Sequence, residues 1–134
     1  MTYLLDTNVC VQYLRGRNPR VRQRLSGTPP HDIAMCSVVM AELYYGALGS
    51  DKPAENRVKV DVFVQPYVSL PFDNAAADIH AQIRRRLEAL GAPIGPYDFQ
   101  IAAITLAHNL TLVTHNTAEF SRVPGLKLED WELP

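Results

Sequence analysis

The stretch Tyr3-Leu4-Leu5-Asp6-Thr7-Asn8 decides the expected fold. An aromatic residue and two leucines run directly into a carboxylate, which predicts a buried strand over residues 3–5 and a helix beginning at Thr7. Asp6 then lies at the carboxyl end of the first strand. Ligands of open parallel α/β sheets bind in the crevice outside these strand ends. Asp6 is therefore the first candidate residue of a functional site.

Strands and helices are expected to alternate along the rest of the chain. Strand-like apolar runs cover residues 33–36, 68–70, 110–114 and, at the edge, 126–128. Helical patterns lie between them, over 7–14, from Pro19 onward, and over 38–48, 53–64, 73–90, 96–109 and 116–120. Ser37 is a suitable N-cap for the 38–48 helix. In the 53–64 helix, Val58, Val62 and Phe63 share one face. The alternation predicts the α/β class, as a three-layer α/β/α sandwich with a central, mostly parallel sheet of four to five strands.

Length and composition are those of one globular domain. A chain of 134 residues, with 47% hydrophobic and 20% charged residues, buries a core without disulfides, so we expect a single domain over residues 1–134. No apolar run reaches the roughly 20 residues of a membrane span, and no secretory signal is evident. Cys10 and Cys36 lie in apolar segments without zinc-ligand spacing, which favours buried free thiols. We therefore expect a cytoplasmic protein with no membrane partner.

Basic residues are clustered although the net charge is only -1. Five arginines fall within ten residues, at positions 15, 17, 20, 22 and 24, and three more are consecutive over 84–86. Local positive surface of this kind suits phosphate binding. The alternative is a pair of solvated helix faces.

Four acidic residues lie near predicted strand-to-helix junctions: Asp6, Glu42, Asp98 and Glu119. Each has a purely structural explanation. Asp6 can cap the first helix, Glu42 can be a solvated helical residue, and Asp98 lies in a first helical turn, where a carboxylate is favoured. Asn116 and Glu119 have the spacing of a capping box.

Together the four acids predict a metal site. No cationic residue is next to any of them in sequence, and Asp98 opens a helix that is apolar on nearly every face. Carboxylates brought close together raise each other's pKa unless a cation neutralises them. Mg²⁺ and Mn²⁺ prefer such oxygen ligands, and either ion can polarise a phosphate and activate a water.

Four motifs carry a family resemblance. They are Leu-Asp-Thr-Asn at 5–8, Met-Ala-Glu-Leu-Tyr-Tyr-Gly at 40–46, Gly-Pro-Tyr-Asp at 95–98 followed by Ile-Ala-Ala at 101–103, and Val-Thr-His-Asn-Thr-Ala-Glu-Phe at 113–120. In this order, and over nearly the whole chain, they resemble the PIN-domain ribonucleases. The chain is most similar to the VapC toxins of bacterial type II toxin–antitoxin pairs.

The resemblance implies a role for each acid. Asp6 and Asp98 match the positions that hold Mg²⁺ most directly, with Mn²⁺ as the alternative ion. Glu42 and Glu119 complete the implied catalytic set. Many PIN domains have an aspartate where this chain has Asn116 or Glu119, so either residue can complete the fourth position. Thr7, Asn8 and Thr114 are candidates for orienting the carboxylates or a phosphate.

The resemblance also implies a substrate and partners. The expected activity is metal-dependent endonucleolytic hydrolysis of RNA. Proteins of this type resemble cutters of structured RNA such as tRNA, and those with a Gly-Pro-Tyr-Asp stretch include ones that cut initiator tRNA in its anticodon region. The 15–24 arginines are the expected phosphate-binding surface, and Tyr13 or Tyr97 is a candidate for base stacking, with core packing as the alternative for both.

A cognate VapB-type antitoxin is expected to fill a groove between the 38–48 and 53–64 helices and to place an arginine among the acids. Tyr44, Tyr45 and Leu48 are its expected apolar contacts. A homodimer, and a hetero-oligomer with the antitoxin, are implied as well.

Three other functions are alternatives to a metal-dependent ribonuclease. A phosphatase with Asp6 as nucleophile usually needs a second aspartate two residues later, where this chain has Asn8. A phospho-accepting receiver domain needs a lysine near a late strand, and Lys127 follows the predicted site junctions. The third is an RNA-binding module whose acids are structural.

Overall fold

The sheet has five strands, and all of them are parallel. A computed structural model describes all 134 residues. The strands are β1 (Tyr3–Leu5), β2 (Ile33–Cys36), β3 (Val68–Leu70), β4 (Thr111–Val113) and β5 (Lys127–Glu129), in the order β3-β2-β1-β4-β5. The chain moves outward from β1 to β3 and then returns to the other side of β1 as β4. The topological switch point therefore lies between β1 and β4, where ligands of such sheets bind.

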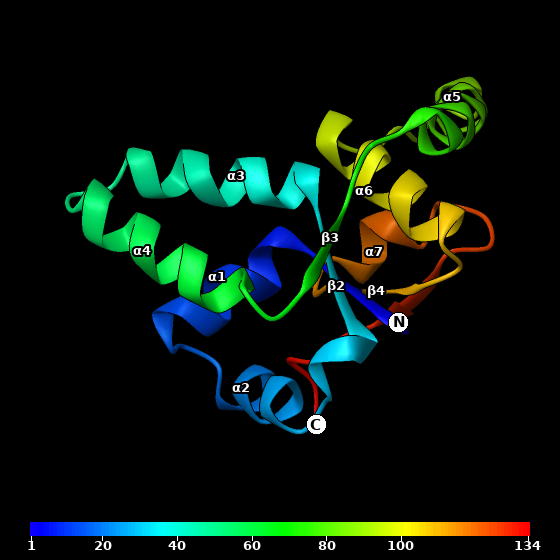
Figure 1. Cartoon of the computed structure of the whole chain (residues 1–134). Coiled ribbons are helices and arrows are strands. Elements are labelled where there is room, and N and C mark those ends of the chain that lie inside the picture. The colour runs from blue at the N-terminus through cyan, green and yellow to red at the C-terminus, as the bar shows by residue number, and fades with distance from the viewer.

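Seven α-helices cover the sheet in two layers. They are α1 (Thr7–Arg15), α2 (Pro19–Ser26), α3 (Ser37–Leu48), α4 (Pro53–Val64), α5 (Asn74–Ala89), α6 (Pro96–Ala107) and α7 (Thr117–Phe120), with a 3₁₀ turn at Pro30–Asp32. Helices α1 to α4 lie on one side of the strands and α5 to α7 on the other (Figure 1). This division is what right-handed crossovers require when the strand order reverses. The predicted α/β/α sandwich is confirmed.

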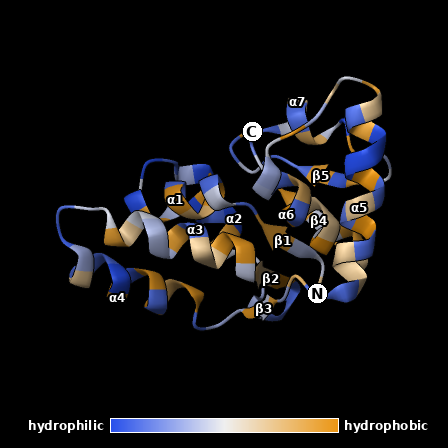
Figure 2. Ribbon diagram, turned by 90° about the horizontal axis from the view of Figure 1, so that it is seen from above, coloured by the Kyte–Doolittle hydropathy of each residue, from blue (hydrophilic) through white to orange (hydrophobic).

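The core is continuous across the central strands. Leu4 and Leu5 of β1 are fully buried, as is every residue of β2. Figure 2 shows apolar residues at β1 and β2 and a mixture of hydrophilic and hydrophobic residues along α4. Helix α6 is buried from Ile101 to Thr105, as its apolar sequence predicts. Cys10 and Cys36 are buried free thiols, which confirms that prediction. No helix is both long and apolar enough to span a membrane.

One local prediction is wrong. Cys36, not Ser37, occupies the N-cap of α3, and the Ser37 hydroxyl instead accepts a bond from the Phe72 N–H at 3.3 Å. Val58, Val62 and Phe63 of α4 line one groove and share a face, as the sequence predicts. Phe63 is buried and its ring stacks on Tyr13 with centroids 4.8 Å apart, whereas Val58 and Val62 are 59% and 67% exposed.

Candidate active site

Asp6 sits at the carboxyl end of the central strand and is only 5% exposed. It is the N-cap of α1, and its Oδ1 accepts a 2.7 Å hydrogen bond from the Thr7 N–H. The capping role expected from the sequence is therefore present. Its Oδ2 accepts a 2.8 Å bond from the Thr114 hydroxyl. Because both oxygens are held, the carboxylate has one fixed orientation.

Thr114 connects the ends of β1 and β4 across the switch point. Its side chain is buried, donates to Asp6, and accepts a 3.0 Å bond from the Asn116 N–H. One hydroxyl therefore positions both the carboxylate after β1 and the backbone after β4. This is the orienting role expected for Thr114 from the sequence.

Glu119 connects α7 to the start of α6. Its Oε1 accepts a 2.7 Å bond from the Gly95 N–H, and its Oε2 accepts a bond from the Asn116 side-chain amide. Asn116 makes no side-chain capping bond to α7, so the capping-box explanation of this pair is wrong. The amide is used instead to hold Glu119.

Gly95 keeps this corner open for Asp98. A Cβ atom at position 95 would lie 3.0 Å from Asp98 Oδ2 and 3.8 Å from Glu119 Oε1. Asp98 lies in the first turn of α6, directly after Pro96 and Tyr97. The glycine thus permits the two carboxylates to approach each other at the helix start.

Three of the four acids, Asp6, Glu42 and Asp98, have a raised pKa. Burial, followed by the nearby charges of Glu119, Asp6 and Glu42, raises the pKa of Asp98 to about 7. Burial also raises the pKa of Asp6, against the bonds from Thr114 and the Thr7 N–H, and Glu119 adds to the rise. Burial raises the pKa of Glu42, and the charge of Asp6 adds to it. The structure therefore brings all four predicted acids into one electrostatic cluster, the acid centre.

The acid centre contains no compensating positive charge. No lysine, arginine or histidine forms an ion pair with Asp6, Glu42, Asp98 or Glu119. Beside Asp6, the buried Thr7 hydroxyl faces Glu42 and lowers the pKa of that carboxyl, against the rise from burial. A hydrated hard cation fits this donor set, since carboxylate oxygens bind such an ion and its waters.

A second carboxylate cluster follows β4 and was missed from the sequence. His115 Nδ1 lies 2.9 Å from Asp130 Oδ2 and 3.6 Å from Glu132 Oε2. Asp130 and Glu132 come from the C-terminal segment, which packs Trp131 edge-on against Tyr3. We call these three residues the tail cluster. The sequence carries no spacing signal for it, because His115 and the segment meet only through the β4–β5 pairing.

The other predicted residues have mixed outcomes. Asn8 is exposed. Tyr13 stacks on Phe63, which is the core-packing alternative, while Tyr97 is 59% exposed and lines a pocket with Glu42. Of the arginines, Arg24 pairs with Glu129 at 2.8 Å.

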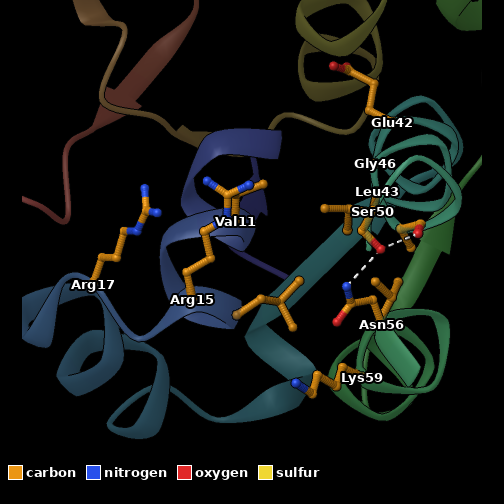
Figure 3. Close-up of a pocket in the computed structure, with 12 residues that line it drawn as sticks. Val11, Arg15, Arg17, Glu42, Leu43, Gly46, Ser50, Asn56 and Lys59 are labelled. Carbon is orange, nitrogen blue, oxygen red and sulfur yellow. Dashed lines mark hydrogen bonds between the residues drawn. The ribbon is translucent and has the colours of Figure 1, made fainter. Parts of the chain in front are cut away.

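A groove runs away from the acid centre between α1, α3 and α4 (Figure 3). Its volume is about 670 Å³. Glu42 belongs to both the groove and the acid centre, so the two are continuous.

Comparisons with known proteins match the chain over nearly its whole length, including this site. A family model described as PIN domain matches residues 3–126. The chain is 38% identical over 131 residues to a tRNA(fMet)-specific endonuclease VapC of Shigella flexneri, covering 98% of each chain. It is 37% identical over 133 residues to Ribonuclease VapC2 of Rickettsia felis, covering 98% of this chain and 99% of the other. Among solved structures, a DNA-bound VapBC from Salmonella typhimurium is similar with a TM-score of 0.92 and 35% identity, covering 98% of each chain.

Proposed function

This chain belongs to the PIN domain family and, within it, to the VapC ribonucleases, and on this premise we propose that it hydrolyses RNA with a divalent metal ion bound at the acid centre. The observation that carries the metal is the convergence of four carboxylates with no positive partner. Asp6 and Asp98 are the proposed ligands of Mg²⁺, or of Mn²⁺, and Glu42 and Glu119 complete the catalytic set.

Each residue has a distinct part in this proposal. A bound Mg²⁺ or Mn²⁺ supplies Lewis acidity toward the scissile phosphate and lowers the pKa of an attacking water. Asp6 offers a carboxylate already fixed by Thr7 and Thr114, so little orientation is lost on binding. Glu119 is the proposed fourth residue rather than Asn116, because Asn116 offers only a neutral oxygen, while its Nδ2 donates to Glu119 and orients it.

The proposed substrate is a structured RNA of the tRNA class. The Shigella relative is named a tRNA(fMet)-specific endonuclease, and so is one from Salmonella typhimurium that is 35% identical. Each of these two alignments covers 98% of this chain, so both include the acid centre and the groove. Exposed Tyr97, next to Asp98, is the proposed stacking surface for an unpaired base.

The proposed protein partner is a VapB-type antitoxin. Solved structures similar to this chain are VapBC complexes from Rickettsia felis and Salmonella typhimurium. Of the apolar contacts expected from the sequence, Tyr44 is occupied, since its ring lies under Arg57 at 3.7 Å and its hydroxyl contacts Asp61. Tyr45 and Leu48 are exposed and stay available for such contacts, and the exposed Val58 and Val62 of α4 line a second groove that can add to them. Homodimerisation stays a prediction.

Two of the other functions lack their required residues at the site. Lys127 is at the amino end of β5, beside Thr111 at the start of β4, and its Nζ contacts the Asn109 carbonyl. Lys127 is therefore at the opposite end of the strands from Asp6. It cannot serve as the lysine that a receiver domain needs beside its acidic site. Asn8, at the second aspartate position of a phosphatase, is exposed and neutral.

RNA cleavage by the Asp98→Asn variant tests the proposal. We expect the parent to cut an initiator-tRNA transcript with Mg²⁺ or Mn²⁺ and to stop in EDTA, and the variant to lose at least about 100-fold in rate. Asp51→Asn, in an exposed turn, is the matched control and should cut as the parent does. A folded Asp98→Asn variant with parental activity, or a parent indifferent to EDTA, would refute the metal mechanism.

A further inference from the structure

The groove beside the acid centre has a basic rim. It is lined by five apolar residues (Val11, Leu14, Leu43, Ala47 and Val60) and by Gly46 and the polar residues Arg15, Arg17, Glu42, Ser50, Asn56 and Lys59. Figure 3 shows Arg15 and Arg17 on one wall, extending in the same direction, and Lys59 on the α4 wall. Three cations therefore border a passage whose far end is Glu42 of the acid centre.

The two arginines of the groove form no ion pair, unlike other members of the arginine cluster. Arg15 and Arg17 are exposed, whereas Lys59 forms an exposed ion pair with Glu55 at 3.8 Å. Arg22 instead lies over the Tyr13 ring at 5.0 Å, and Arg24 binds Glu129 and lies over Trp131 at 4.8 Å. The fold thus divides the cluster into arginines used for packing and arginines available to a ligand.

Gly16 places the two free arginines together. It ends α1 in the left-handed conformation, with φ 63, and the Arg17 N–H then bonds back to the Gln12 carbonyl at 3.2 Å. The chain reverses within one residue, so Arg15 and Arg17 border the same groove. This turn needs a glycine, because other residues rarely adopt that φ.

The floor of the groove suits the sugars and bases of an unpaired strand. Leu14, Leu43 and Val60 supply apolar surface. The Asn56 amide donates to the Ser50 hydroxyl at 2.8 Å, which leaves the Asn56 carbonyl oxygen open to a donor. Guanidinium and ammonium groups above such a floor match phosphates that alternate with less polar groups.

We propose that this groove binds the single-stranded RNA segment next to the scissile phosphate, with Arg15, Arg17 and Lys59 each contacting a phosphate. The inference rests on the proposed ribonuclease function. The resemblance implied an antitoxin segment in this groove between α3 and α4. An RNA strand is favoured here because Arg15 and Arg17, which form no ion pair, border this groove and not the neighbouring one, where the exposed Val58 and Val62 lie.

Salt-dependent RNA binding tests this assignment. Binding of a fluorescein-labelled single-stranded RNA is measured in the full-length Asp98→Asn background, where cleavage does not interfere. Adding Arg15→Gln, Arg17→Gln and Lys59→Gln should lower the slope of log affinity against log salt by about 2, because each single-strand phosphate contact contributes about 0.7. The matched control, Arg84→Gln, Arg85→Gln and Arg86→Gln on α5, should leave the slope unchanged.

Charge-conserving variants separate phosphate binding from folding. Arg15→Lys with Arg17→Lys should keep the slope, and circular dichroism should show that all variants are folded. An unchanged slope in the triple glutamine variant overturns the proposal, and so does loss of antitoxin affinity in that variant without any loss of RNA affinity. The outcome is independent of the metal mechanism, since binding is measured without turnover.

Discussion

The acid centre and the tail cluster both contain carboxylates, but they balance their charge differently. In the tail cluster, the imidazole of His115 lies within hydrogen-bonding distance of Asp130 and close to Glu132. In the acid centre, burial and then the charges of three other acids raise the pKa of Asp98, and no cation is paired with any of the four. The tail cluster contains an imidazole that can pair with its carboxylates, whereas the acid centre contains no such partner.

Adjacent residues divide between the two clusters. Thr114 turns inward and holds Asp6, while His115 turns outward to the C-terminal segment. A single step along the chain after β4 thus separates a positioning residue of the proposed metal site from a residue that fastens the tail. Substitutions at these two neighbours should have different consequences.

Thr114→Val should have a larger effect than substitution of His115. The variant keeps the shape of the side chain but removes the donor to Asp6 and the acceptor for the Asn116 N–H, so cleavage should fall by about 10- to 100-fold. Leaving buried partners unsatisfied should also lower the free energy of unfolding by about 1–3 kcal/mol. Thr114→Ser is the control and should retain most activity. Parental kinetics in the valine variant would show that the orientation of Asp6 is unimportant.

The pH dependence of stability should reveal the uncompensated acids. Because the pKa of Asp98 is raised to about 7 from its ordinary value near 3.8, folding is penalised when Asp98 is ionised. The free energy of unfolding of the metal-free protein should therefore rise as pH falls from about 8 toward about 4. At pH 8, added Mg²⁺ should stabilise the protein, because the ion binds only the folded state.

Chemical denaturation at several pH values, with EDTA or with Mg²⁺, measures this difference. In Asp98→Asn, the rise in the free energy of unfolding from pH 8 to pH 4 should be smaller than in the parent, since the titrating carboxyl is absent. A parent that is less stable at pH 5 than at pH 8 in EDTA would contradict the assigned electrostatics.

His115→Gln should have the smallest effect. It removes the imidazole partner of Asp130, whose side chain is only 8% exposed, so the free energy of unfolding should fall by about 1 kcal/mol. Cleavage should stay within about twofold of the parent, because the imidazole pairs with the tail rather than with the acid centre. Thermal unfolding and the cleavage assay check both expectations, and a large loss of activity would mean that the two clusters act as one.

The sequence predicted those features that depend on local pattern. The β1 strand and its terminal Asp6 follow from an apolar run ending in a carboxylate, and α6 follows from its apolar faces behind Pro96. The convergence of Glu42 and Asp98 on Asp6 follows from parallel strands, whose carboxyl ends share one edge of the sheet.

Features set by tertiary contacts were not predicted. Phe63 packs against Tyr13 of α1, and the Asn116 amide bonds to Glu119, which is held in turn by the Gly95 N–H. Partners of this kind lie on other elements, so the residue pattern within one strand or helix does not predict them.

Metal binding by Asp98→Asn tests the central claim most directly. Isothermal titration of Mn²⁺ into the parent, Asp98→Asn and His115→Gln compares the acid centre with the tail cluster in one experiment. The account predicts binding to the parent and to His115→Gln with equal affinity, and loss of that binding in Asp98→Asn. Unchanged affinity in a folded Asp98→Asn variant would contradict it.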